Sequence, residues 1–274
     1  MDIHPTAIVS PSAELGQGTR VGPFCVIGPR VRLGANCHLW SHVAVHGETV
    51  LGDDCEIFPF AVLGTTPQDK KVDGSTGNRL VIGNRNRIRE QVTIHGGTPF
   101  GLGVTTVGDD NMLLVGSHIG HDARVGSHVV FTNGAMAAGH TVIQDRVVLG
   151  AMVGVHQFGR VGRMAMVGAG AMLSRDAPPF SLVQGDRARV VGVNVIGLKR
   201  QGVPTDDVAA IKRAFRQLLW RSGTLADRVA AVRERFGDHP SVREILTFVA
   251  DSKRGVCRPR GRFDGGAERD SVED

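Results

Sequence analysis

The sequence has no tyrosine and only two tryptophans, and aromatic residues make up 5% of its 274 residues. So few aromatic side chains exclude a core built on large rings, whereas 37 glycines favour many tight turns around small or aliphatic residues. No uninterrupted apolar run approaches the roughly 18 residues of a membrane span, and residues 1–10 lack the basic and apolar regions of a signal peptide. We therefore expect a cytoplasmic protein without stable membrane insertion.

The first two thirds of the chain lack a net positive charge, which gathers near the end of the chain. Residues 187–262 contain 17 Lys or Arg against 7 Asp or Glu, whereas residues 1–186 carry a net charge of −1 and the last twelve carry −4. Such a basic region favours an acidic partner, which could be a nucleic acid, a membrane surface or an acidic carrier protein. The few aromatic residues of this region lie on predicted apolar helix faces, which argues against a nucleic acid.

Apolar residues recur every six positions, from Val9 to Leu63, from Ile82 to Ile94 and from Val107 to Leu173, and glycine commonly follows them. This repeat predicts a parallel β-helix, in which short strands stack and each coil buries its apolar residues against the next. The pattern resembles the left-handed β-helix of hexapeptide acyltransferases, which has about 18 residues in each coil. Of the two breaks in the repeat, the first contains polar residues 65–78 and predicts a projecting loop.

The four cysteines form no CxxC pair, so neither a zinc knuckle nor a disulfide framework is indicated. Cys25, Cys37 and Cys55 each lie two residues before a repeating aliphatic residue, a position that is often occupied by a small residue. We interpret these three as buried packing residues.

Beyond residue 190 the six-residue period gives way to a helical one. Apolar residues favour a helix that begins near Thr205 and a second that ends near Gly237, and Pro240 opens a third that ends near Ala250. We therefore expect a β-helix over residues 1–190, a helical domain over residues 191–252 and a disordered tail over residues 253–274.

Histidines gather in the second half of the repeat. His121, His140 and His156 are spaced so that they lie on successive coils near one edge, with His118 close by. One interpretation is a histidine general base whose tautomer Asp122 fixes. Another is three neutral imidazoles that hold a zinc ion, as in a γ-type carbonic anhydrase-like hydratase. Spacing alone leaves both open.

Several short stretches together identify a more specific family. These stretches are HPTAIV (4–9), VGPFCVIGP (21–29), IGNRNRIRE with VTIH (82–95), SHIGHD (117–122), AGH (138–140), VHQF (155–158), DAPPF (176–180) and GVNVIGLKR (192–200). Through them the chain closely resembles, from about residue 2 to residue 255, the acyl-carrier-protein-dependent UDP-N-acetylglucosamine O-acyltransferases of lipid A biosynthesis.

The resemblance implies a homotrimer with active sites between subunits, and a 3-hydroxyacyl chain transferred from acyl carrier protein to the 3-hydroxyl of UDP-N-acetylglucosamine. It implies no cofactor and no metal, because the carrier protein is itself the acyl donor. In the catalytic group His121 matches the general base, Asp122 the residue that orients it, and Gly139 the backbone donor to the oxyanion. The matched substrate-binding residues are Gln68, Asp69, Lys71, His95, His118, His140, His156, Gln157, Asn194 and Arg200.

Two positions bear on specificity. Ala169 matches a position that gates acyl length, and a small residue there implies a medium or long chain. The family commonly has a glutamate where this chain has Ile196, which leaves open a 3-amino sugar nucleotide as acceptor and an amide as product. The related N-acyltransferases that add a second chain carry an additional N-terminal uridine-binding domain, whereas the repeat here begins by Val9.

Overall fold

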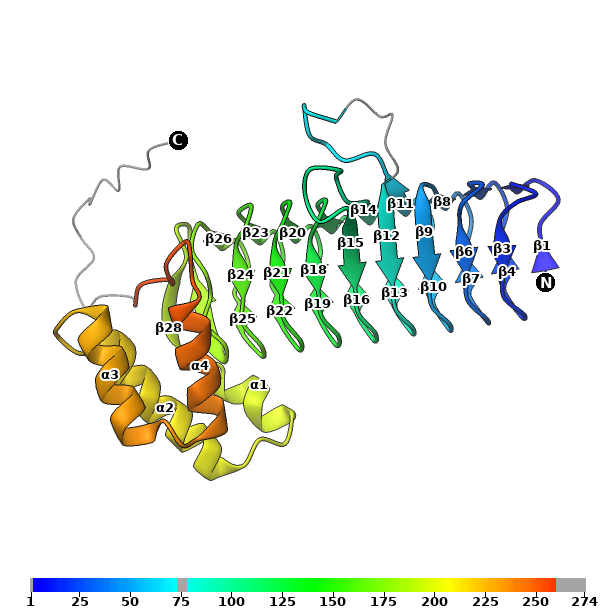
Figure 1. Cartoon of the computed structure of the whole chain (residues 1–274). Helices are drawn as coiled ribbons and strands as arrows, with labels where there is room; N and C mark the ends of the chain where they lie inside the picture. Colours follow the sequence, from blue (N-terminus) through cyan, green and yellow to red (C-terminus); the bar gives the residue numbers. More distant parts are fainter. Residues whose placement is uncertain (1, 73–77, 260–274) are drawn as a thin grey trace.

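A computed structural model describes residues 2–72 and 78–259, in which short strands stack into the three walls of a long prism (Figure 1). Sheet A consists of β1 (Asp2–Ile3), β4 (Arg20–Val21), β7 (His38–Leu39), β10 (Glu56–Ile57), β13 (Arg87–Ile88), β16 (Met112–Leu113), β19 (Val130–Phe131), β22 (Val148–Leu149), β25 (Met166–Val167), β27 (Ser181–Gln184) and β28 (Arg189–Val193). Sheet B consists of β2 (Ile8–Val9), β5 (Val26–Ile27), β8 (Ala44–Val45), β11 (Val62–Thr65), β14 (Thr93–His95), β17 (His118–Ile119), β20 (Met136–Ala137), β23 (Gly154–Val155) and β26 (Met172–Leu173). Sheet C consists of β3 (Glu14–Leu15), β6 (Arg32–Leu33), β9 (Glu48–Leu51), β12 (Arg79–Ile82), β15 (Val104–Val107), β18 (Arg124–Val125), β21 (Val142–Ile143) and β24 (Arg160–Val161).

The six-residue period follows from this geometry. Each two-residue strand points its first side chain outward and its second inward, as β16 does with exposed Met112 and buried Leu113. The repeating apolar residue is the inward one, so successive coils pack on one another along the whole prism. The predicted left-handed β-helix followed by helices is confirmed. Cys25, Cys37 and Cys55 are buried, as predicted.

Two sets of turns between the sheets matter for the site. We call the turns from sheet B to sheet C the B–C corner (residues 120–123, 138–141 and 156–159) and those from sheet C to sheet A the C–A corner (residues 108–111, 126–129 and 144–147). Both breaks in the repeat are insertions between a strand of sheet B and one of sheet C, and they project from the same edge of the prism (Figure 1). The predicted loop is one of them, although its residues 73–77 lie outside the described residues.

Four helices follow the prism and pack beside its C-terminal end (Figure 1). Helices α2 (Thr205–Trp220), α3 (Leu225–Phe236) and α4 (Pro240–Ala250) confirm the helical periodicity, and a capping box between Thr224 and Asp227 begins α3. The short α1 (Val195–Arg200) was not predicted because six residues are too few to show a period. None of the helices in the described ranges is long and apolar enough to cross a membrane.

The start of the expected disordered tail is a correction. Residues 253–259 are ordered because their backbone pairs with the prism: Gly255 O accepts a hydrogen bond from Asp176 N at 2.9 Å, and Cys257 N donates to Asp176 O at 2.8 Å. Cys257 is fully buried there. Main-chain pairing needs no apolar periodicity, so the sequence pattern could not reveal it. Residues 260–274 lie outside the described residues.

Candidate active site

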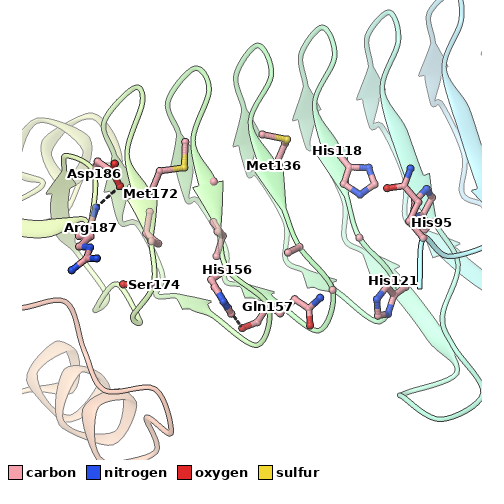
Figure 2. Close-up of a pocket in the computed structure, with 17 residues that line it drawn as sticks. His95, His118, His121, Met136, His156, Gln157, Met172, Ser174, Asp186 and Arg187 are labelled. Atoms are coloured by element: carbon pink, nitrogen blue, oxygen red, sulfur yellow. Dashed lines mark hydrogen bonds between the residues drawn. The ribbon is translucent and has the colours of Figure 1, made fainter. Parts of the chain in front are cut away.

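A groove of about 510 Å³ runs along the outer face of sheet B and the B–C corner. Its walls come from β14, β17, β20, β23 and β26, from the turns that follow the last four, and from Gln68 in the first inserted loop. Figure 2 shows two rows of side chains, with His118, Met136 and Met172 on the face of the sheet and His121, Gln157 and His156 along the turns. Five coils therefore contribute to one open cavity.

Asp122 is the buried anchor of this corner. Its φ of 57° is left-handed, a conformation that aspartate tolerates better than most residues. The carboxylate accepts hydrogen bonds from the backbone N–H groups of Thr98 (3.1 Å), Leu102 (2.8 Å) and Gly103 (3.1 Å) and from Thr98 Oγ1 (2.7 Å). Burial raises the pKa of Asp122, but hydrogen bonds from His121 and Thr98 outweigh it, so the pKa lies below its usual value. The second inserted loop thus holds a fixed anion.

His121 is oriented by that anion. Its Nδ1 lies 2.8 Å from Asp122 Oδ2, and an ionised carboxylate accepts only, so Nδ1 carries the proton. Nε2 is then left with a free lone pair. Only 7% of the His121 side chain is exposed, and it lines the groove. Asp69, from the first inserted loop, places Oδ2 3.9 Å from Nε2. The arrangement is that of a base with a fixed tautomer.

Gly139 lies on the next coil, directly against His121. A Cβ at this position would lie 2.6 Å from His121 Nε2, so any side chain would displace the imidazole. Among the described residues the Gly139 N–H has no hydrogen-bond acceptor. A buried N–H without an acceptor is rare in proteins and is available to a ligand. Base and donor therefore face the same place in the groove.

His140 closes the corner behind His121. Its ring meets the edge of the His121 ring at a centroid distance of 5.0 Å and stacks on Phe158 at 4.5 Å. Burial lowers the pKa of His140 although Asp122 raises it, and Nε2 lies 3.8 Å from Asp122 Oδ2. His140 is therefore neutral at pH 7 and can donate or accept a hydrogen bond.

Two further histidines lie on the sheet. His95 and His118 meet edge to face at 4.8 Å, and His118 Nδ1 lies 2.8 Å from Thr93 Oγ1. Burial, with a smaller effect of His118 and His121, lowers the pKa of His95 to about 4. Burial also lowers the pKa of His118. Both rings are neutral at pH 7, which suits contacts with an uncharged sugar or acyl chain.

Comparison with known proteins places this geometry in a family. A model described as UDP-N-acetylglucosamine O-acyltransferase, domain 2, matches residues 176–257, and one for bacterial transferase hexapeptides matches residues 12–47. An acyl-[acyl-carrier-protein]–UDP-N-acetylglucosamine O-acyltransferase of Rhizobium johnstonii is 43% identical over 94% of either chain. The chain belongs to this acyltransferase family. The solved UDP-N-acetylglucosamine acyltransferase of Francisella novicida has a TM-score of 0.91 at 36% identity and covers 93% of this chain and 94% of its own. The Arabidopsis enzyme has a TM-score of 0.84 at 31% identity and covers 93% of this chain and 100% of its own.

Three of the residues expected at the acyltransferase site lie outside the groove of the single chain. The Asn194 side chain caps α1, where it accepts from Gly197 N at 3.1 Å and donates to Met164 O at 2.9 Å. Arg200 is exposed at the end of α1, and Ala169 is exposed at the turn before β26. Lys71 is exposed near the groove, with Nζ 6.0 Å from the Phe100 ring centroid. The roles of these residues stay predictions.

Sequence reasoning missed several residues of the acyltransferase groove. Thr98, which holds Asp122, lies in the second break of the repeat, so the break itself was a signal for it. Met136, Gly154 and Met172 occupy the outward position of successive strands in sheet B. That position carries no repeat pattern, and only the register of the strands shows that these residues are neighbours.

The same corner is the candidate for a metal, and its chemistry does not fit the zinc alternative. Among the described residues, one cluster brings three possible metal ligands together, namely His121, Asp122 and His140. It offers two imidazoles and a carboxylate rather than three imidazoles. The Asp122 oxygens already accept hydrogen bonds from Thr98, Leu102, Gly103 and His121. The three-imidazole ligand set that the hydratase interpretation requires is therefore not formed by this cluster.

Proposed function

We propose that this acyltransferase moves a 3-hydroxyacyl chain from acyl carrier protein to the 3-hydroxyl of UDP-N-acetylglucosamine, the first step of lipid A biosynthesis. The names of its relatives specify that donor and acceptor. The observation that carries the proposal is the juxtaposition of His121 Nε2 with Gly139, whose N–H has no acceptor among the described residues. The His121 imidazole can take a proton, and the Gly139 N–H can stabilise negative charge that forms at the same place.

His121 acts as the general base. Nε2 takes the proton of the sugar hydroxyl, and the hydroxyl oxygen attacks the thioester carbon of the acyl carrier protein. The carbon–sulfur bond then breaks, and the sulfur leaves with the proton that His121 held. Asp122, 2.8 Å from Nδ1, stabilises the imidazolium that forms between the two steps. A positioned base of this kind contributes about 10²–10⁴-fold to the rate.

Gly139 stabilises the oxyanion. The thioester oxygen gains negative charge when the sugar oxygen attacks, and a backbone N–H already in place stabilises that charge without reorganisation. Glycine is required because a Cβ would lie 2.6 Å from the base. The neutral rings of His95, His118 and His140 contact the sugar or the acyl chain, and so do His156 and Gln157. Gln68, Asp69 and Lys71 face the nucleotide, whose phosphates need a cation.

The active enzyme is a homotrimer whose neighbouring subunits complete the site. Asn194 and Arg200 lie outside the groove of their own chain, so they serve a neighbouring subunit's groove. The outer faces of sheets A and B favour such packing, because both present methionine and aliphatic side chains, among them Met112, Val130 and Met136. The basic residues of 187–258 supply a docking face for the acidic carrier protein, and the cytoplasm remains the predicted location.

A second acceptor is favoured by one observation. Ile196 is 68% exposed on α1 at a position where the family commonly has glutamate, so this chain lacks a carboxylate that could contact the nucleotide. An acceptor with a 3-amino group would give an amide by the same chemistry. Asp69 is close enough to His121 to interact with either substituent.

One experiment tests both acceptors. The full chain is incubated with 3-hydroxyacyl carrier protein and either UDP-N-acetylglucosamine or its 3-amino analogue, and the product is identified by mass spectrometry. We expect transfer to the 3-hydroxyl, with an ester that mild base cleaves. A base-resistant product formed faster from the amino sugar would establish the second acceptor. Transfer to neither would reject the proposed function.

A further inference from the structure

The second inserted loop (residues 96–103) closes over the Asp122 carboxylate. It lies between β14 and β15 and projects from the edge of the prism (Figure 1). A Cβ at Gly101 would lie 2.5 Å from Asp122 Oδ2 and 2.6 Å from Thr98 Oγ1, so only a glycine lets the loop backbone come this close. The Asp122 side chain has no exposed surface. Protein groups therefore supply the hydrogen bonds that this buried carboxylate needs.

The two oxygens of the carboxylate have different partners. Asp122 Oδ1 accepts hydrogen bonds from the backbone N–H groups of Leu102 at 2.8 Å and Gly103 at 3.1 Å. Oδ2 accepts from Thr98 Oγ1 at 2.7 Å and from His121 Nδ1 at 2.8 Å. The Thr98 N–H lies 3.1 Å from either oxygen. Thr98 and His121 therefore share the oxygen that orients the base.

Thr98 is joined to the loop through its backbone and to Asp122 through its hydroxyl. Its carbonyl accepts hydrogen bonds from Gly101 N at 3.2 Å and Gly103 N at 3.1 Å, which closes the turn of the loop. An ionised carboxylate only accepts, so the hydroxyl donates to Oδ2. Thr98 is fully buried and does not line the groove. A change of its hydroxyl therefore leaves the backbone bonds of the loop in place and affects a substrate only through Asp122.

We propose that Thr98 is a positioning residue for the catalytic base and acts through Asp122 Oδ2, an inference that rests on the proposed acyl transfer. With the hydroxyl bond in place, one side of Oδ2 is occupied and the His121 Nδ1–H binds the other. Without that bond, the carboxylate can turn toward His140, whose Nε2 lies 3.8 Å from Oδ2. His121 then loses the partner that fixes its tautomer and stabilises the imidazolium formed in the reaction.

The first test separates catalysis from binding. Thr98→Val replaces the hydroxyl with a methyl group, and Thr98→Ala removes it without crowding Oδ2. With 3-hydroxyacyl carrier protein and UDP-N-acetylglucosamine, both variants of the full chain should lower kcat by about tenfold, the lower end of what a hydrogen bond to a charged group contributes. KM for both substrates should change less than about twofold, because Thr98 touches neither. Thr98→Ser keeps the hydroxyl and should restore kcat to within about twofold of the parent.

The second test is a double-mutant cycle with Asp122. In an Asp122→Ala background, Thr98→Ala should change kcat less than about twofold, because no carboxylate is left for the hydroxyl to hold. A tenfold loss in both backgrounds would overturn the proposal, since Thr98 would then act on the fold or on another group. A rise in KM without a fall in kcat would overturn it as well.

Thr19→Val is the matched control. Thr19 is buried like Thr98, lies in the turn between β3 and β4, and donates from its hydroxyl to Gly34 O at 2.7 Å. This variant should lower the melting temperature and leave kcat at the parent's value, and thermal melting shows whether each variant folds. An equal loss of kcat in Thr19→Val would overturn the specific role of Thr98.

Two outcomes separate this inference from the proposed function. Absence of transfer by the parent to UDP-N-acetylglucosamine would reject the proposed function, and this inference with it. Transfer by the parent with an unchanged kcat in Thr98→Val and Thr98→Ala would reject the role of Thr98 alone.

Discussion

The C–A corner and the B–C corner are built from the same type of backbone turn, but the second residue of the turn has a different role in each corner. On the C–A corner and the earlier turns in line with it, a side-chain oxygen on each coil accepts a hydrogen bond from a backbone N–H on the preceding coil. Asp53 accepts from Ala35 N, Asn84 from Asp53 N and Asp109 from Asn84 N, at 2.6–2.8 Å. The ladder continues through Ser127 and Asp145. On the B–C corner the same position holds His121, Gly139 and Gln157.

The difference teaches how a repeat acquires a site. On the C–A corner the side chains of Asp109, Ser127 and Asp145 are used by the fold, because each closes a hydrogen bond that the turn would otherwise leave open. On the B–C corner the Gly139 N–H has no such acceptor among the described residues, so it is open to a ligand, and His121 lines the groove. Asp122 is bonded there to the backbone of the second inserted loop, and it holds His121.

The largest expected effect comes from removing the base on the B–C corner. His121→Ala should lower kcat by about 10³-fold, within the range of general-base catalysis, because it removes the group proposed to take the sugar proton. His128→Asn removes an imidazole from the C–A corner and should change kcat less than twofold. Steady-state rates of acyl transfer check both variants. Full activity in His121→Ala would reject the assignment of the base.

The next effect comes from crowding the two corners with one methyl group. Gly139→Ala should lower kcat by about a hundredfold, because its Cβ would displace His121 and move the N–H that receives the oxyanion. Gly126→Ala crowds Asp145 on the C–A ladder instead, so it should lower the melting temperature but leave kcat of the folded enzyme unchanged. Equal losses of kcat in both variants would show that the two corners do not differ in function.

The comparison also shows what a sequence can reveal. The inward residues repeat because each packs against its counterpart one coil away, so the prism was predictable from periodicity alone. His121 and Asp122 stood out by their residue types and spacing, but only the family resemblance assigned their roles. Gly139 looked like many other glycines, and its role was implied only by the family resemblance. Its importance depends on a missing acceptor one coil away, which no local pattern records.

The roles of outward-facing residues and the long-range pairings were harder to predict from the sequence. Met172 and Gly154 become neighbours only through the register of sheet B, and Thr98 reaches Asp122 only because the second loop folds back over the corner. The pairing of residues 253–259 with Asp176 likewise uses backbone groups that every residue has. Expectation failed there because the tail was judged by its side chains.

The buried histidine of the groove should make stability depend on pH. His95 has a pKa of about 4 in the folded chain against an ordinary value of 6.5, so the unfolded chain binds more protons between these values. Stability is therefore full above about pH 6.5 and is lost as the pH falls toward 4, by up to about 3 kcal/mol. His95→Gln should make this dependence less steep in urea unfolding measured across that window, and the lowered pKa values of His118 and His140 should leave a remaining slope of the same sign. An equal slope in the variant and the parent would contradict the prediction.

The smallest effect tests the ladder of the C–A corner. Asp109→Ala removes the acceptor for Asn84 N, which lies 2.6 Å from Asp109 Oδ1, and should lower the free energy of unfolding by about 1–2 kcal/mol. Asp109→Asn keeps an oxygen at that position, as Asn84 does one coil earlier, and should recover most of the loss. Denaturant unfolding gives the two free energies, and kcat should stay unchanged in both variants. A fall in kcat with Asp109→Ala would mean that the ladder also positions the catalytic corner, because both corners are joined through the same coils.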